Sequence, residues 1–252
     1  MSIFNCIKVE LLKFKNSHIK FTIIIPFLLS IVMLLVDLFI RKESILSRYS
    51  PVIDDGFHSI VAENHLSLIW PIILMFAIII NSISIFYIDI KNNSITNMLS
   101  SSISRTKYYI SKIIIILFCT ATLIIIENVG LVFIGYIFNL SGNIDIELMI
   151  RYGWMQFFCC LGIIGIQGLL FSITTKITTL ISINIFIICM SILMLRFSFL
   201  TAIIPYLQIA NSLPIVTDGQ LILQSMCYSV LLFIIFNILS IFIFNKIDIK
   251  GE

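Results

Sequence analysis

The chain has 252 residues, of which 60% are hydrophobic and 12% charged, and its mean hydropathy is +1.12. A soluble domain is nearer half apolar and a quarter charged, so this chain cannot cover its apolar surface with polar side chains. The composition excludes a disordered chain, a secreted disulfide scaffold and a coiled coil. The formal net charge of +3 is too small to carry an argument alone, and we expect no nucleic-acid partner. A multi-pass membrane protein folded as one unit is predicted.

The segment before the first long apolar run, residues 1–20, is predicted to form an amphipathic helix in the membrane interface. Its charged residues flank an apolar helical face on both sides, which is typical of such helices. The members of that face are Ile3, Phe4, Ile7, Leu11 and Phe14. A frayed extension of the first span is the alternative, but the charges interrupt any continuous apolar run and favour the interfacial helix.

Six stretches are long and apolar enough to cross about 30 Å of hydrocarbon, which takes roughly 20 helical residues. They are residues 21–40, 66–88, 113–138, 154–173, 177–195 and 226–244. They are rich in isoleucine, but an open strand in lipid would leave its backbone unpaired, and the alternation of a barrel is missing. The predicted fold is all-α, with six transmembrane helices.

Lysine and arginine predict the orientation of these spans. With the N-terminus in the cytoplasm, the inner segments hold eleven of the sixteen Lys and Arg, and the outer segments hold five. Because positive charge gathers on the cytoplasmic side, both termini are expected inside. Most acidic side chains near the spans then lie outside, in the first, second and last outer loops.

Motifs for catalysis and nucleotide binding are missing from the sequence. It contains no GxxxxGK[ST], HExxH, GxSxG or GxGxxG, and no CxxC or Cys/His cluster. We therefore expect no enzyme activity, no metal and no cofactor in this chain. The six cysteines are expected to be small buried hydrophobes. Gly162, Gly165 and Gly168 recur every three residues, which indicates a close contact between helices.

Polar side chains inside the predicted spans are candidate functional residues. Glu127 lies in the body of the third span, where a carboxylate is costly unless it is paired, protonated or hydrated. It is either a substrate-path or gating residue, or a hydrogen-bonded packing residue. Gln167, in the fourth span, is a weaker candidate because amides often join membrane helices. Asp37 is expected to pair with Arg41, one helical turn away.

The three histidines lie apart in the sequence. His18 is expected at the inner interface, and His58 and His65 in the first outer loop. Solvated surface residues are the expected interpretation for all three. A pH-sensing role for His58 and His65, near the acidic residues of that loop, is the alternative.

The segment between the second and third spans is long enough for a short helix on the inner face of the membrane. Ser94 could cap this helix, and Ile95, Met98 and Leu99 would give it an apolar side. The basic residues after it lead back into the bilayer. They are Arg105, Lys107 and Lys112.

This segment resembles that of the permease subunits of type-2 ABC transporters. That family shows an acid at the end of the second span, a small or polar turn, a short helix ending in Leu, a Pro-x-Ser-Arg stretch and a Lys opening the third span. The matching residues are Asp89, Asn93-Ser94, Met98-Leu99, Ile103-Ser104-Arg105 and Lys112. The acid is more often Glu in the family, and Ser102 stands where Pro is common.

The resemblance extends over most of the chain. The opening Glu10-Leu-Leu-Lys-Phe-Lys15 is similar to the interfacial helix of the family, and the six spans match. Residues 197–224, broken by two prolines and a glycine, are similar to its short helices that dip into the outer leaflet. Within the family, the chain looks most like lantibiotic self-protection permeases of Gram-positive bacteria.

The resemblance implies one permease domain over 1–252, in the bacterial cytoplasmic membrane. Its implied partners are cytoplasmic ATPase subunits that bind ATP and Mg, a second permease chain (identical or sister), lipid, and a peptide substrate. Residues 89–104 would dock on the ATPase, with Asp89 orienting the short helix and Arg105 anchoring its end. The implied coupling residues are Asp89, Ser94, Met98, Leu99, Arg105 and Lys112.

Other functions stay open at this point. Within transport, the cargo could be a small drug, another antibiotic or a polysaccharide. A membrane anchor or assembly subunit without a transport role is a further alternative. A membrane-embedded enzyme needs clustered His, Asp or Ser residues within its spans, and Glu127 alone is thin support for it.

Overall fold

The structure is a computed structural model of the chain, and its described residues are 3–15, 20–49, 53, 56–67, 69–91, 104–138, 140 and 144–246. Within these ranges the chain is helical and forms no strand. Six helices are long and apolar enough to cross a membrane: α2 (Phe21–Tyr49), α4 (Ile69–Lys91), α6 (Arg105–Ile137), α7 (Ile146–Ile173), α8 (Ile177–Met194) and α11 (Gly219–Lys246). The shorter elements are α1 (Ile3–Lys15), α3 (Gly56–Leu66), α9 (Ser198–Ile203), α10 (Pro205–Gln208) and the 3₁₀ turn η2 (Ile209–Asn211).

Each predicted span falls on one of the six long helices, which confirms the all-α, six-helix prediction. Several boundaries were wrong. Leu66 ends α3 instead of opening the second span, Phe138 caps α6, and Leu195 follows α8. Except for α8, the long helices also extend beyond the predicted apolar runs, because their backbone hydrogen bonds continue into the neighbouring polar residues. The extension of α2 is bent at Arg41, where the backbone leaves helical geometry (φ −130°, ψ 21°).

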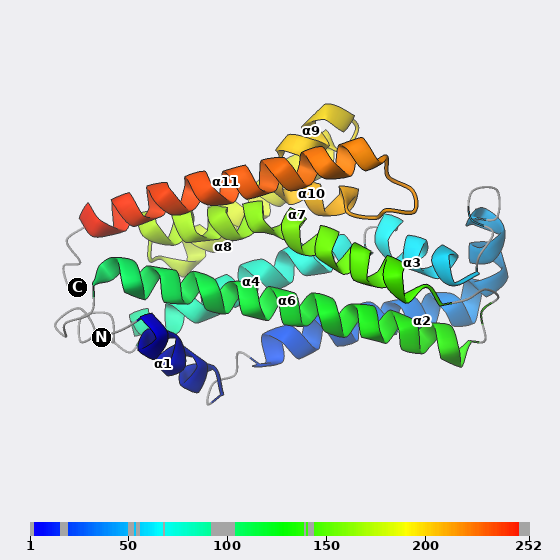
Figure 1. Cartoon of the computed structure of the whole chain (residues 1–252), viewed down its shortest axis with the longest axis horizontal. Coiled ribbons are helices and arrows are strands. Elements are labelled where there is room, and N and C mark those ends of the chain that lie inside the picture. Colours follow the sequence, from blue (N-terminus) through cyan, green and yellow to red (C-terminus); the bar gives the residue numbers. More distant parts are fainter. Residues whose placement is uncertain are drawn as a thin grey trace.

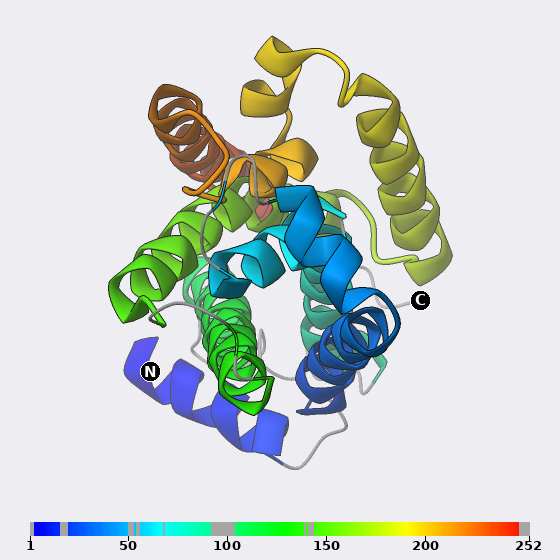
Figure 2. The same cartoon turned by 90° about the vertical axis from the view of Figure 1, so that its right-hand side faces the viewer.

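The long helices run roughly along one axis (Figure 1). At one end of this bundle lie α1 and the C-terminal end of α11, and at the other end lies α3. Viewed along the axis, α1 lies across the outside of the bundle and α8 stands at its edge (Figure 2). The short elements α9, α10 and η2 lie between α8 and α11, so the first part of the stretch after the fifth span does form short helices, whereas its last residues, 219–224, belong to α11.

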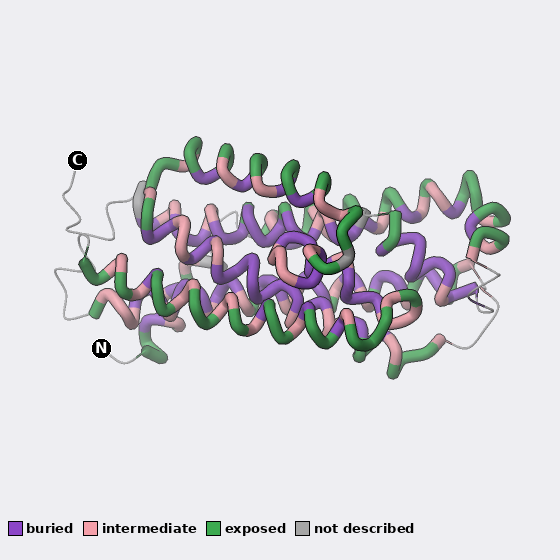
Figure 3. The backbone as a smooth tube through the Cα atoms, turned by 90° about the horizontal axis from the view of Figure 1, so that it is seen from above, coloured by how far each residue is buried: buried purple, intermediate pink, exposed green. Residues whose placement is uncertain are grey.

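Buried residues line the interior of the bundle and exposed residues follow its outer helices (Figure 3). In α7, 67% of the span is buried, against 11% in α11, so α7 is the central helix. The outer faces carry large apolar side chains, such as Phe39 (78% exposed) and Leu193 (70% exposed). Such faces suit lipid and not water, which agrees with a membrane-spanning bundle.

Glycines on α7 allow the close contact that their spacing predicted. A Cβ atom at Gly165 would lie 3.0 Å from the Cα of Phe233 on α11. The backbone N–H of Gly162 donates to the Ser229 hydroxyl of α11 over 2.7 Å. Small residues thus bring the two backbones together.

The cysteine prediction is only partly correct. Four of the six side chains are buried, but Cys189 on α8 and Cys227 on α11 are exposed. An outer face that meets lipid is as apolar as the interior, so an apolar run does not distinguish buried from lipid-facing positions.

Candidate functional site

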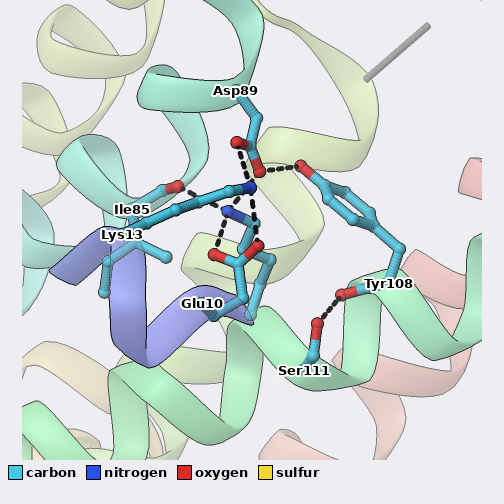
Figure 4. Close-up of polar contacts among 7 residues, drawn as sticks. Glu10, Lys13, Ile85, Asp89, Tyr108 and Ser111 are labelled. Atoms are coloured by element: carbon cyan, nitrogen blue, oxygen red, sulfur yellow. Dashed lines mark hydrogen bonds and ion pairs between the residues drawn. The ribbon is translucent and has the colours of Figure 1, made fainter. Parts of the chain in front are cut away.

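Four charged side chains from three helices meet at the end of the bundle where α1 lies (Figure 4). Glu10 and Lys13 come from α1, Asp89 from the end of α4, and Lys112 from the first turns of α6. The Nζ atom of Lys112 lies 2.5 Å from Oε2 of Glu10 and is also paired with Asp89. The Nζ atom of Lys13 lies 2.9 Å from Glu10 Oε1 and 2.7 Å from Asp89 Oδ1. We call these four residues the α1 ion cluster.

The α1 ion cluster is largely removed from solvent. Glu10 is 4% exposed, Asp89 and Lys112 are fully buried, and the side chain of Lys13 keeps 26% of its surface exposed. Two acids and two bases balance to zero net charge, and their mutual attraction offsets part of the cost of removing the ions from water. Further hydrogen bonds complete the site: Lys112 donates to the Ile85 carbonyl (3.0 Å), and the Tyr108 hydroxyl donates to Asp89 Oδ2 (3.0 Å).

Lys13 stays charged in this setting. Burial by itself lowers the pKa of its amine, but the carboxylates of Asp89 and Glu10 outweigh burial and raise the pKa above its ordinary value. Lys13, at the partly exposed edge of the cluster, therefore stays protonated. Changes of pH near neutrality leave its ion pairs with Glu10 and Asp89 intact.

The sequence of α1 explains why its charges point inward. Cys6, Glu10 and Lys13 recur at intervals of four and three residues, so they share one helical face. Cys6 and Glu10 on that face are buried, whereas Phe4 (75% exposed) and Leu12 (54% exposed) point away from the bundle. A helix that buries a glutamate side chain and exposes a phenylalanine side chain is unsuited to an aqueous surface. The predicted helix is confirmed, and its place in the membrane interface stays a prediction.

The predicted coupling residues have different outcomes. Asp89 and Lys112 come together directly. Arg105 instead reaches the C-terminal end of α11, where its guanidinium donates to the carbonyls of Asn245 (3.3 Å) and Phe244 (3.5 Å). A cation at a helix C-terminus is favourable because the last carbonyls lack helical partners. Three further coupling residues lie outside the described residues: Ser94, Met98 and Leu99.

Sequence reasoning missed the roles of Glu10, Lys13 and Tyr108 in this cluster. The available signal was the face that Glu10 and Lys13 share, opposite the exposed apolar residues of the same helix. Their partners could not be identified, because Glu10 and Lys112 are 102 residues apart.

A second polar cluster lies inside the bundle, around Glu127 of α6. Glu127 is fully buried, and its Oε1 accepts hydrogen bonds from Ser30 of α2 (2.7 Å) and Asn64 of α3 (2.9 Å). Glu127 lies ten residues before the end of α6, which is about 15 Å along a helix. Because Asn64 reaches it, α3 is inserted into the bundle and does not lie on its surface.

The expectation of a solvated first outer loop is therefore wrong for α3. His65 is 1% exposed, its Nδ1 lies 2.8 Å from the Tyr152 hydroxyl, and its Nε2 lies 3.0 Å from the Ala210 carbonyl. Glu63 is also buried, accepts from the Tyr49 hydroxyl (2.8 Å) and pairs with Arg48 (3.5 Å). Burial lowers the pKa of His65 to about 4, so the imidazole is neutral at physiological pH. The polar residues of α3 have hydrogen-bond and ion-pair partners on other elements, which explains why α3 can be buried.

Other sequence expectations can be placed as well. Arg41 and Asp37 form the expected pair, at 2.7 Å. Gln167 of α7 donates to Asn184 of α8 (2.7 Å) and to the Tyr206 hydroxyl of α10 (3.0 Å). These contacts join three elements, as expected of an amide that connects membrane helices.

Comparison with known proteins identifies no relative: the sequence matches no protein-family model and no curated protein. In the part of the chain that the structure describes, no group of three or more His, Cys, Asp or Glu could hold a metal ion. Over its described residues the chain is thus all-helical with six candidate membrane spans, and the α1 ion cluster and the cluster around Glu127 are the features from which a function can be argued.

Proposed function

We propose that the chain is the permease subunit of an ABC exporter that protects a bacterium against a lantibiotic-like peptide. Its partner ATPases would bind at the end of the bundle that carries the α1 ion cluster. One observation carries this proposal. The cluster ties together α1, the end of α4 and the start of α6, and these last two helices hold the two ends of residues 89–104, the segment that would dock on the ATPase. Movement of that segment would therefore move three helices together.

Charge supports a cytoplasmic location for this end. The helix termini that meet here carry basic residues, and basic residues favour the cytoplasmic side. They are Lys8, Lys13, Arg105, Lys107, Lys112 and Lys246. With this end inside, both termini are cytoplasmic, and the membrane is the bacterial cytoplasmic membrane.

The energy for export would come from the partner. The chain has no phosphate-binding motif, so ATP and Mg²⁺ would bind only to the ATPase subunits. Closure of those subunits would shift the bundle between two arrangements, and a second permease chain, identical or sister, would complete the path.

Exposed acids at the opposite end support a cationic peptide as cargo. They lie near the termini of α2, α7 and α11: Glu43, Asp145 and Asp218 are exposed there, and Glu147 is paired with Arg151. Acidic side chains attract a cationic ligand by their charge. A small drug would not need them.

Two substitutions of equal chemistry test the docking site. Leu99→Asp places a charge in the proposed docking segment, and Val216→Asp places the same charge in an exposed position (43% exposed) at the opposite end. Each variant is co-expressed with candidate ABC ATPase subunits, and the purified complex is quantified. We expect Leu99→Asp to abolish the complex and Val216→Asp to leave it intact.

The cargo is tested by survival of cells exposed to a cationic membrane-active peptide. Protection should require both the permease and an ATPase with an intact ATP site, and peptide should stimulate ATP hydrolysis by the complex. An intact complex with Leu99→Asp would remove the docking site from the proposal. Resistance to small drugs but not to peptide would replace the cargo, and a complex without stimulated hydrolysis would indicate an assembly subunit.

A further inference from the structure

Glu127 is hydrogen-bonded on one side only. Ser30 and Asn64 both donate to Oε1, whereas Oε2 is buried and has no hydrogen-bond partner among the residues that the structure describes. An ionised carboxylate would leave that oxygen bare in an apolar interior, which costs several kcal/mol. A proton on Oε2 removes the charge and keeps both hydrogen bonds to Oε1.

The elements around Glu127 supply no cation to balance its charge. Ser30 faces it from α2 and Asn64 from α3, Tyr152 of α7 interacts with it electrostatically, and the histidines of α3 are His58 and His65. His65 is not that cation, because burial lowers its pKa to about 4 and keeps the ring neutral; its Nε2 faces the Ala210 carbonyl and its Nδ1 faces the Tyr152 hydroxyl.

The remaining charges near α3 are paired elsewhere. Glu63 interacts with Arg48, Arg41 and Tyr49 of α2, at the outer end of that helix. On α4, the titratable side chains lie in the last turns, at the opposite end of the bundle. Within the described residues, Glu127 is thus an isolated buried acid that forms no ion pair.

Access of water to Glu127 depends on α3. Three consecutive residues hold this helix in place: Glu63 contacts α2, Asn64 contacts Glu127, and His65 contacts α7 and the Ala210 carbonyl. Nine of the eleven residues of α3 are buried, although α3 is not one of the six candidate spans. Withdrawal of α3 would remove the Asn64 donor and open the carboxyl group to solvent from that end.

We propose that Glu127 is a proton-binding site whose occupancy is linked to the position of α3. The proton stays on Glu127 while α3 is inserted, and it passes to water when α3 withdraws. Linkage works in both directions, so raising the pH favours withdrawal and re-insertion of α3 takes up one proton. This inference does not depend on the ATPase partner or on the cargo.

Infrared spectroscopy of the purified chain in lipid nanodiscs tests the first half of the proposal. The difference spectrum between wild type and Glu127→Gln should contain one C=O stretching band of a protonated carboxylic acid at neutral pH. A band of an ionised carboxylate in its place would overturn the proposal. Ser30→Ala provides a second variant if Glu127→Gln does not fold: loss of one donor should shift the acid band, and an unshifted spectrum would contradict the assignment.

Hydrogen exchange of residues 56–67 tests the linkage to α3. Wild type and Glu127→Gln are compared at the same pH, which cancels the intrinsic pH dependence of exchange. Near pH 4 we expect nearly equal protection, because an exposed glutamate with a pKa of about 4.3 then also keeps most of its proton, and near pH 6 we expect wild type to exchange at least about tenfold faster than the variant, since each pH unit above that exposed pKa changes the differential proton binding about tenfold. A ratio that does not change with pH would show that the proton and α3 are not linked.

Discussion

Removal of one ammonium group from the α1 ion cluster should destabilise the protein strongly. Lys112→Met keeps the volume of the side chain but leaves Glu10 and Asp89 with Lys13 as their one cation in the cluster, so the buried group gains a net negative charge. Breaking a buried ion pair from one side costs about 3–5 kcal/mol, because the remaining charge stays buried without compensation.

A second substitution should restore part of that loss. In Lys112→Met with Asp89→Asn, one charge of each sign is gone, and the Glu10–Lys13 pair remains neutral as a unit. We therefore expect the double variant to lose about 2–3 kcal/mol less than the sum of the two single variants, at the upper end of coupling between contacting residues.

The assay is unfolding of the purified chain in mixed micelles by added SDS, followed by tryptophan fluorescence. Arg151→Met is the matched control, since it removes the cation of an exposed pair with Glu147 at 3.0 Å. That loss should be at most about 1 kcal/mol. Additive single and double effects, within about 0.5 kcal/mol, would refute the view that the four charges act as one unit.

Three further predictions follow from burial and close contact. Gly165→Val should destabilise the protein by about 1–3 kcal/mol in the same assay, because backbone atoms of Phe233 cannot move aside, whereas Gly219→Ala, with open space around it, should have little effect. The free energy of unfolding should fall by up to about 3 kcal/mol as the pH drops from 6.5 toward 4. The reason is that His65 binds a proton in the unfolded state but not when it is buried in the folded state. His65→Gln should remove this dependence in acid titrations of stability. Gln167→Leu should cost about 1–3 kcal/mol in the SDS assay, because it removes the buried hydrogen bonds of the amide to Asn184 and Tyr206, which keep only their bond to each other and the bond from Asn184 to the Leu180 carbonyl. An unchanged midpoint would contradict the role of that amide.

The six long helices could be predicted because the signal is local. About 20 apolar residues in a row have one stable conformation in lipid, whichever helices later surround them. The same argument cannot show which faces are buried. Cys189 and Cys160 both lie in apolar runs, yet the first is exposed and the second is buried.

The buried polar clusters could be predicted only in part. Glu127 and Asp89 were singled out, the first by its cost in a membrane and the second by a family pattern. The insertion of α3 was missed because Glu63, Asn64 and His65 look like any polar loop. Their burial depends on partners as far away as Ala210, 145 residues along the chain. Long-range pairing of this kind leaves no periodic trace in a single sequence.

The most direct test of the proposed function is a photocrosslink from the permease to its ATPase. A photoreactive amino acid is placed at position 99 in one sample and at position 216 in another, and each is irradiated in membranes that contain both proteins. A crosslinked ATPase is predicted from position 99 and not from position 216. A crosslink from position 216, or none from position 99 in a complex that still forms, would contradict the docking of an ATPase at the α1 end of the bundle.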